Sequence, residues 1–69
     1  MNKVLSIMGA RLMRQITLAE RTGISIWWLN RCLKHPSLYQ FRKEEKEKII
    51  RALCLPDDVD RKKLFGEDA

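Results

Sequence analysis

Basic, polar and aromatic side chains that could bind a charged ligand concentrate between residues 14 and 43. The side chains of this kind that could contact such a ligand include Arg14, Asn30, Arg31, Lys34, His35 and Lys43. Neutralisation of phosphates by Lys and Arg is the main sequence-independent contribution to DNA binding. An arginine can also donate two hydrogen bonds to one guanine. This segment therefore predicts recognition of a polyanion.

The charge is unevenly distributed along the chain. The sequence holds 14 Lys and Arg against 9 Asp and Glu, a net charge of +5. Residues 1–43 carry eight basic residues and one acidic residue (+7), whereas residues 44–69 carry six basic and eight acidic residues (−2). A positive field of this kind attracts polyanions. Ordinary solvated surface charge is the alternative, and for any single flanking cation both interpretations stay open.

Residue types that support catalysis or metal binding are scarce. The chain has one histidine, the two cysteines Cys32 and Cys54, dispersed carboxylates, no CxxC pair and no glycine-rich phosphate loop. These residues supply no nucleophile–base pair and no metal-ligand spacing. We therefore expect a protein that is not an enzyme and has no cofactor, metal or small-molecule substrate. Both cysteines are expected to be buried free thiols in a reducing cytosol.

Length and composition predict one small domain over residues 1–69. A chain of 69 residues buries only about 60% of its unfolded surface, which leaves little room for a deep catalytic cavity. The hydrophobic content of 45% is enough for a packed core. The apolar run at residues 4–10 ends at Arg11 and Arg14, too early for a signal peptide or a membrane span. We expect a cytoplasmic protein with no membrane partner.

Helical periodicity dominates the chain, and no strand-type alternation is sustained, so we predict an all-α fold with five helices. Four of them are expected at about residues 2–12, 15–22, 26–34 and 42–53, and a short fifth helix should end before Gly66. The expected N-terminal caps are Asn2, Ser25, and Asp57 or Asp58. The fourth helix should carry the surface ion pairs Glu44–Lys48 and Glu47–Arg51.

The spacing of residues 15–34 predicts two helices joined by a tight turn. Leu18 and Leu29 should point into a shared core, Ala19 must be small where the helices cross, and Gly23 must tolerate a positive φ. Ile24 and Cys32 should complete this interior. Such a pair leaves the later helix protruding, and an α-helix fits the major groove of B-DNA.

Residues 15–25, which read QITLAERTGIS, resemble the Gln-x-x-Leu-Ala-x-x-Thr-Gly-Ile-Ser motif of lambda-repressor-like (Cro-type, XRE) helix-turn-helix regulators. Leu29 and Cys32 extend the similarity, as do the later segments 49–53 and 64–65, so that it covers about residues 11–66. The resemblance implies a compact five-helix domain with the helix-turn-helix at its second and third helices. It also implies a sequence-specific DNA-binding transcriptional regulator, a repressor of the type that phages and mobile elements carry.

The resemblance further implies roles for individual residues. Gln15 and Ser25 stand where the family contacts DNA phosphates, and the positions that face the groove are Ile26, Trp27, Trp28 and Arg31. The sequence departs from the family here, because polar base-reading residues are frequent where Ile26 and Trp27 stand. Either these side chains contact thymine methyl groups beside an Arg31 fork on guanine, or the tandem tryptophans serve packing or a protein partner.

Other departures from the family surround the motif. Arg14 replaces the usual Ser or Thr cap, Leu33 and His35 stand where Glu and Gly are common, and about four extra residues precede the fourth helix. A homodimer is the usual arrangement of such regulators on DNA. Val59, Leu64 and Phe65 could form its contact or could close the monomer core. A helix-turn-helix module that binds a protein through the Trp27 and Trp28 surface is the alternative function.

Overall fold

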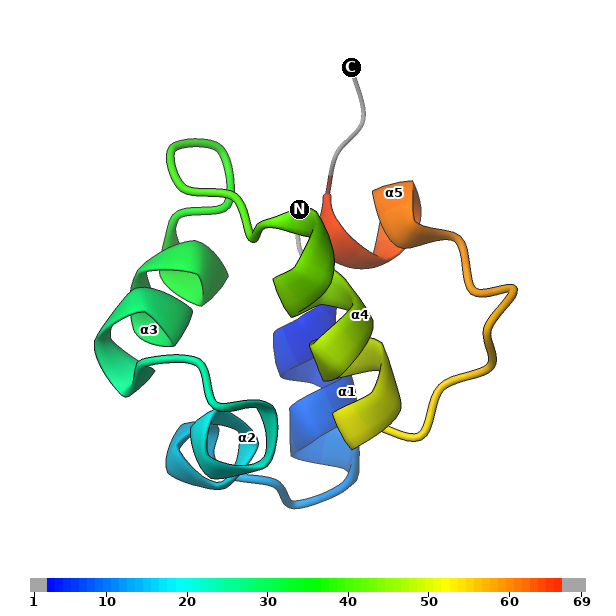
Figure 1. The fold of residues 1–69 in the computed structure, drawn as a ribbon, viewed down its shortest axis with the longest axis horizontal. Helices are drawn as coiled ribbons and strands as arrows, with labels where there is room; N and C mark the ends of the chain where they lie inside the picture. The colour runs from blue at the N-terminus through cyan, green and yellow to red at the C-terminus, as the bar shows by residue number, and fades with distance from the viewer. Residues whose placement is uncertain (1–2, 67–69) are drawn as a thin grey trace.

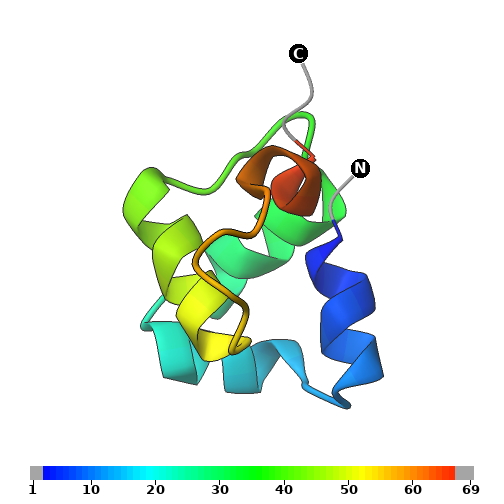
Figure 2. The ribbon, with the colours of Figure 1, turned by 90° about the vertical axis from the view of Figure 1, so that its right-hand side faces the viewer.

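The computed structural model describes residues 3–66, and within them the chain forms five α-helices and no strand. The helices are α1 (Val4–Ala10), α2 (Gln15–Thr22), α3 (Ile26–Lys34), α4 (Lys43–Ala52) and α5 (Arg61–Phe65). The prediction of an all-α fold is confirmed. Figure 1 shows α3 at one edge of the molecule, whereas α5 and the loop before it lie on the opposite side. Figure 2, in which the α5 side faces the viewer, places α3 behind it.

A single apolar core joins the helices. Its members are Val4, Met8, Leu18, Ala19, Ile24, Leu29, Cys32, Leu33, Phe41, Ile49, Ile50, Leu53, Leu64 and Phe65. Each large aliphatic side chain removed from water in this way contributes about 1.5–3 kcal/mol. All the interior residues predicted between the second and third helices are buried, which confirms that part of the helical pattern.

The turn between α2 and α3 is held by backbone geometry and by one threonine. Gly23 has φ +75°, the left-handed conformation that glycine adopts without steric cost. The Thr22 hydroxyl donates to the carbonyl oxygen of Leu18 (2.8 Å) and accepts from the Ile24 amide (3.2 Å). Because Ile24 is then buried beside Leu18 and Leu29, the turn fixes where α3 leaves α2.

The start of α5 differs from the prediction. Neither Asp57 nor Asp58 caps it; the Asp60 carboxylate does, accepting from the Lys62 and Lys63 amides at 3.1 and 3.2 Å. The reason is a turn after Pro56, whose carbonyl accepts from the Val59 amide and delays the helix. Ser25 stands at the N-cap of α3, but its side chain makes no capping hydrogen bond. The predicted cap Asn2 lies outside the described residues.

Two further expectations are wrong. Glu47 pairs with Arg61 of α5, with its two carboxylate oxygens 2.6 and 2.8 Å from the guanidinium nitrogens, rather than with Arg51 one turn along α4. Cys32 is buried as predicted, but Cys54 is exposed and has φ +55°. A helical period continued past α4 would have placed Cys54 inside, whereas this backbone reversal turns its side chain outward.

The apolar residues of α5 close the core of the protein. Leu64 and Phe65 are buried, and the Phe65 ring meets the Phe41 ring edge to face with centroids 5.8 Å apart. The Lys3 amide also donates to the Leu64 carbonyl, which ties α5 to the start of α1. The sequence left open whether Leu64 and Phe65 form a dimer contact or close the core of the monomer, and the structure shows that they close the core. Among the described residues, no helix has the length and apolarity needed to cross a membrane.

Candidate nucleic-acid interface

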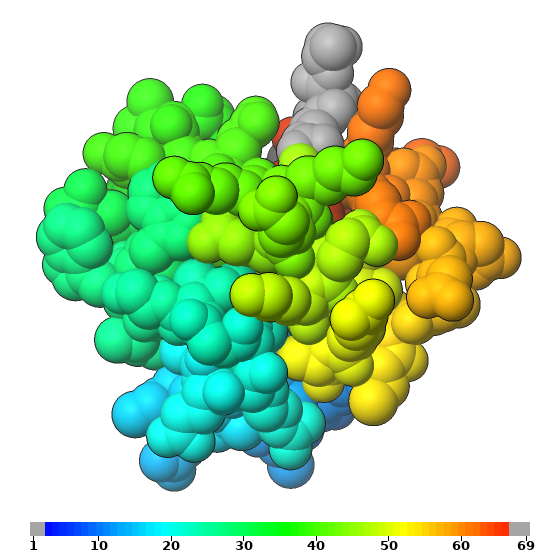
Figure 3. Space-filling view, in the orientation of Figure 1, coloured from blue at the N-terminus to red at the C-terminus, as the bar shows by residue number. Residues whose placement is uncertain are grey.

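The helix α3 has one face in the core and one face in solvent. Its inward face carries Leu29, Cys32 and Leu33, all at most 3% exposed. On its outward face, Trp27 is 65% exposed and Ile26 is 44% exposed. Figure 3 shows α3 and the loop after it as one edge of the molecular surface. A helix held in this way can meet a partner along its outer side without unfolding of the domain.

Arg31 is the cation that lies in the middle of this outer face. Its guanidinium carbon is 3.9 Å from the centroid of the Trp27 ring, one turn earlier on α3. It is also 5.6 Å from the centroid of Tyr39, which lies in the loop between α3 and α4. Both distances are within the range of cation–π attraction. Trp27 and Arg31, predicted separately as groove-facing residues, thus form one contact pair.

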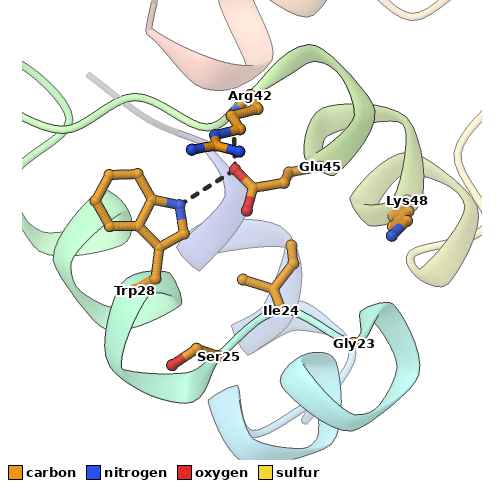
Figure 4. A pocket seen from close by; sticks show the side chains of 7 residues that line it. All are labelled: Gly23, Ile24, Ser25, Trp28, Arg42, Glu45 and Lys48. Atoms are coloured by element: carbon orange, nitrogen blue, oxygen red, sulfur yellow. Dashed lines mark hydrogen bonds between the residues drawn. The ribbon is translucent and has the colours of Figure 1, made fainter.

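Trp28 points toward α4 instead of along the outer face. It is half-buried, and its indole Nε1 donates to Glu45 Oε1 at 3.1 Å (Figure 4). The Tyr39 ring meets its ring at an angle of 76° with centroids 6.0 Å apart. Successive residues on a helix lie about 100° apart, so neighbouring tryptophans reach different environments. The packing interpretation of Trp28 agrees with this geometry, whereas Trp27 stays on the surface.

Gln15 and Asn30 connect the outer parts of α2 and α3. The Asn30 amide nitrogen donates to Gln15 Oε1 at 2.9 Å, and both side chains are half-buried. Gln15 is the first residue of α2, so this bond fixes the start of α2 beside the middle of α3. The Gln15 amide nitrogen remains able to donate to an external acceptor such as a phosphate oxygen.

The N-terminus of α3 borders a shallow hollow between α2, α3 and α4. Its lining residues are Gly23, Ile24, Ser25, Trp28, Arg42, Glu45 and Lys48. In Figure 4 the Ser25 hydroxyl points away from Glu45. The hydroxyl is exposed and makes no cap, and the first amides of a helix have no acceptor within the helix. This end of α3 therefore offers hydrogen-bond donors and a partial positive charge.

The remaining predicted contact residues lie at three places. Arg14 is the exposed residue before α2, and Lys34 and His35 are exposed at the end of α3. Lys43 does not join them. It lines a hollow between α4 and α5 with Lys46, Glu47, Arg61 and Lys62. The extended backbone of Arg42 at the start of α4 turns Lys43 toward α5 and leaves Arg42 beside Trp28.

Three residues of this surface were missed by sequence analysis: Tyr39, Arg42 and Glu45. Glu45 had a detectable signal, because a glutamate three residues after the start of a helix commonly accepts from the capping amide. It does so here, with the Arg42 amide 2.8 Å from Glu45 Oε1. The contact of Tyr39 with Arg31 had no such signal, since it depends on the path of a loop between two helices.

Burial affects one titratable group beneath α3. Desolvation, with a smaller effect from the Glu45 charge, raises the pKa of the Cys32 thiol to about 11. Cys32 is therefore a neutral core side chain at physiological pH.

Within residues 3–66, no three His, Cys, Asp or Glu side chains gather as metal ligands would. Comparisons of the chain with models of protein families, with curated proteins and with solved structures gave no match.

Proposed function

We propose that this protein is a sequence-specific regulator of transcription that binds double-stranded DNA with α3 in the major groove. The observation that carries the proposal is the outer face of α3, where Trp27, Arg31 and Lys34 follow one another at helical spacing, while the opposite face of the helix is buried in the core. An α-helix is the element that fits this groove. The domain would act in the cytoplasm as a repressor that occupies an operator.

Phosphate contacts in this proposal come from the ends of α2 and α3. Arg14, Gln15 and Ser25 lie at the two helix N-termini, where backbone amides favour an anion. Lys34 and His35 lie at the other end of α3. Contacts of this kind fix the register of a protein on the duplex, while base contacts carry the sequence preference.

The proposed assembly on DNA is a two-fold dimer with half-sites about one helical turn apart. Because Leu64 and Phe65 are buried, a dimer contact has to use other apolar residues. Leu12 and Leu38 are 92% and 74% exposed, which makes them candidates for such a contact. Sedimentation with and without the selected duplex would give the stoichiometry.

Selection of bound sequences from a random duplex pool tests the proposal. We expect a defined motif, and we expect the affinity for it to fall steeply as salt is added, because each neutralised phosphate releases counterions. Arg31→Gln should weaken binding to the selected duplex by about tenfold or more. The matched control is Lys63→Gln, which removes the same charge from an exposed position on α5 and should change affinity by less than about threefold.

The exposed indole of Trp27 supports a second candidate, a module that binds a protein through an aromatic anchor. The two functions separate in NMR spectra of the labelled domain. Shifts of α3 resonances on addition of the selected duplex support DNA binding. If no duplex is selected and none moves α3 resonances, DNA binding is wrong and the protein-binding module takes its place.

A further inference from the structure

Arg31 is half-buried, yet the N–H groups of its guanidinium donate to no acceptor among residues 3–66. Its contacts in this part of the chain are with the Trp27 and Tyr39 rings. A guanidinium carries five N–H donors and always bears a charge. A cation that is partly withdrawn from water without an acceptor is available to an external partner.

The geometry of the contact leaves these donors usable. Guanidinium N–H groups lie in the plane of the group, whereas Trp27 holds Arg31 through a ring 3.9 Å from the guanidinium carbon. Aromatic rings attract guanidinium groups by stacking and by the cation–π effect, and neither consumes an N–H group. The side chain is thus restrained by its contacts while its capacity to donate is retained.

The second ring of this arrangement is itself anchored. Tyr39 meets Trp28 edge to face, and Trp28 donates to Glu45 of α4. The loop residue that borders Arg31 is therefore connected through Trp28 to a helix outside the α2–α3 pair. Trp27 needs no such support, because it lies one turn before Arg31 on the same helix.

We infer that Trp27 and Tyr39 are positioning residues that hold the Arg31 guanidinium so that its fork reads one guanine in the major groove. This inference rests on the proposed function. Guanine offers two adjacent acceptors, O6 and N7, which match the fixed spacing of the fork. Arginine that is ordered before binding loses less rotamer freedom on binding, which favours affinity and geometric selectivity. Lys34, a flexible point charge at the end of α3, suits phosphate instead.

Trp27 can be varied with little risk to the fold, because it is 65% exposed. The pair of variants is Trp27→Ala, which removes the ring, and Trp27→Phe, which keeps one. The probes are four duplexes, the selected one and three that carry the other bases at the position where Arg31→Lys abolishes the base preference. For the wild type we expect a preference for guanine there of about tenfold or more.

Trp27→Ala should reduce this guanine preference about threefold to fivefold, and Trp27→Phe should restore most of it. The double variant Trp27→Ala with Arg31→Lys should lose no more of the guanine preference than Arg31→Lys alone, since both substitutions act on one contact. Tyr39→Leu should act in the same direction as Trp27→Ala, with Tyr39→Phe as its control. An equal loss of affinity on all four bases would overturn the inference, because it indicates a phosphate contact.

A measurement on the free protein separates failure of this inference from failure of the proposed function. NMR relaxation of the Arg31 Nε–H group reports how ordered the side chain is without DNA. We expect high order in the wild type and lower order in Trp27→Ala. A mobile Arg31 in the wild type overturns the positioning role even where the duplex binds. An ordered Arg31 in a protein that selects no duplex overturns DNA binding and, with it, the guanine assignment.

Discussion

Two arginines on opposite sides of the molecule make different use of the same side chain. Arg61 of α5 donates to both carboxylate oxygens of Glu47 and to the carbonyl oxygens of Asp57 and Val59. The guanidinium of Arg31 on α3 donates to no group among the described residues and lies against the Trp27 ring. Charge alone does not distinguish the two sites. The two sites differ in what their guanidinium N–H groups bind, because those of Arg61 bind groups of the fold whereas those of Arg31 are open to a ligand.

The difference extends from the arginines to their surroundings. On the α5 side, Leu64 and Phe65 lie on the same helix as Arg61 and belong to the core. On the α3 side, Trp27 faces solvent, although an indole that is 65% exposed gains little stability from burial. A protein that keeps a large aromatic side chain on its surface beside an unused guanidinium has a surface suited to binding.

The largest expected effect contrasts the aromatic residues of the two sides. Phe65→Ala should lower the free energy of unfolding by about 3–5 kcal/mol, because it empties a buried site. Trp27→Ala should lower it by less than about 1 kcal/mol. Urea titration measures both, and Phe65→Leu serves where the alanine variant is already unfolded. Equal losses at the two positions would contradict the assignment of Trp27 to binding.

The next effect concerns alkaline pH and the inner face of α3. The folded pKa of Cys32 is raised to about 11 from an ordinary value of 9.0. The buried, protonated thiol makes its full contribution to the free energy of unfolding below pH 9. That contribution is lost as the pH rises toward 11, because the thiol of the unfolded chain releases its proton at a lower pH than the thiol of the folded protein. The loss should reach about 2 kcal/mol. Stability measured from pH 8 to 11 should therefore fall less in Cys32→Ala than in the wild type.

The exposed thiol provides the control for that experiment. Cys54→Ala should retain the alkaline loss of stability, because Cys54 is exposed to solvent in the folded protein. A thiol reagent at neutral pH should modify Cys54 before Cys32. Modification of both thiols at the same rate would show that the inner face of α3 opens to solvent.

The smallest effect concerns acid pH and the α5 side. The hydrogen bond from Arg61 lowers the pKa of Glu47 below its ordinary value of 4.5. Stability from this pair is present above pH 4.5 and is lost as the pH falls through the folded pKa. The loss should be small, because both side chains are partly in water. Thermal unfolding between pH 7 and 3 should show a weaker acid dependence in Glu47→Gln, whereas Glu44→Gln should behave as the wild type.

Regular elements with strong local signals were predictable from sequence. Residues 15–34 combined a helical period, a glycine that ends a helix and small or apolar residues at the crossing point. Burial of Leu18, Leu29 and Cys32 follows directly from that period, since each helix must turn its apolar side inward. The exposure of Trp27 beside the half-buried Trp28 follows in part from the 100° rotation between neighbours.

Irregular segments were not predictable, because their conformation is decided by long-range contacts. The position of the α5 cap depended on how the chain turns after Pro56, and three aspartates within residues 57–60 offered equivalent local signals. The place of Lys43, which lines the hollow between α4 and α5, depends on the path of the loop that leads into α4. The partner of Glu47 lies fourteen residues away, where no local rule reaches.

Glu45 has a consequence for redesign of the domain. Its Oε1 atom accepts both from the Arg42 amide, which starts α4, and from the indole of Trp28 on α3. Exchange of Trp28 for a side chain without an N–H group would leave the Glu45 carboxylate with the Arg42 amide but without the indole donor. Exchange of Glu45 would remove the acceptor of both donors, the amide at the start of α4 and the Trp28 indole. Grafting α3 onto another scaffold therefore requires transfer of the loop and the first turn of α4 with it.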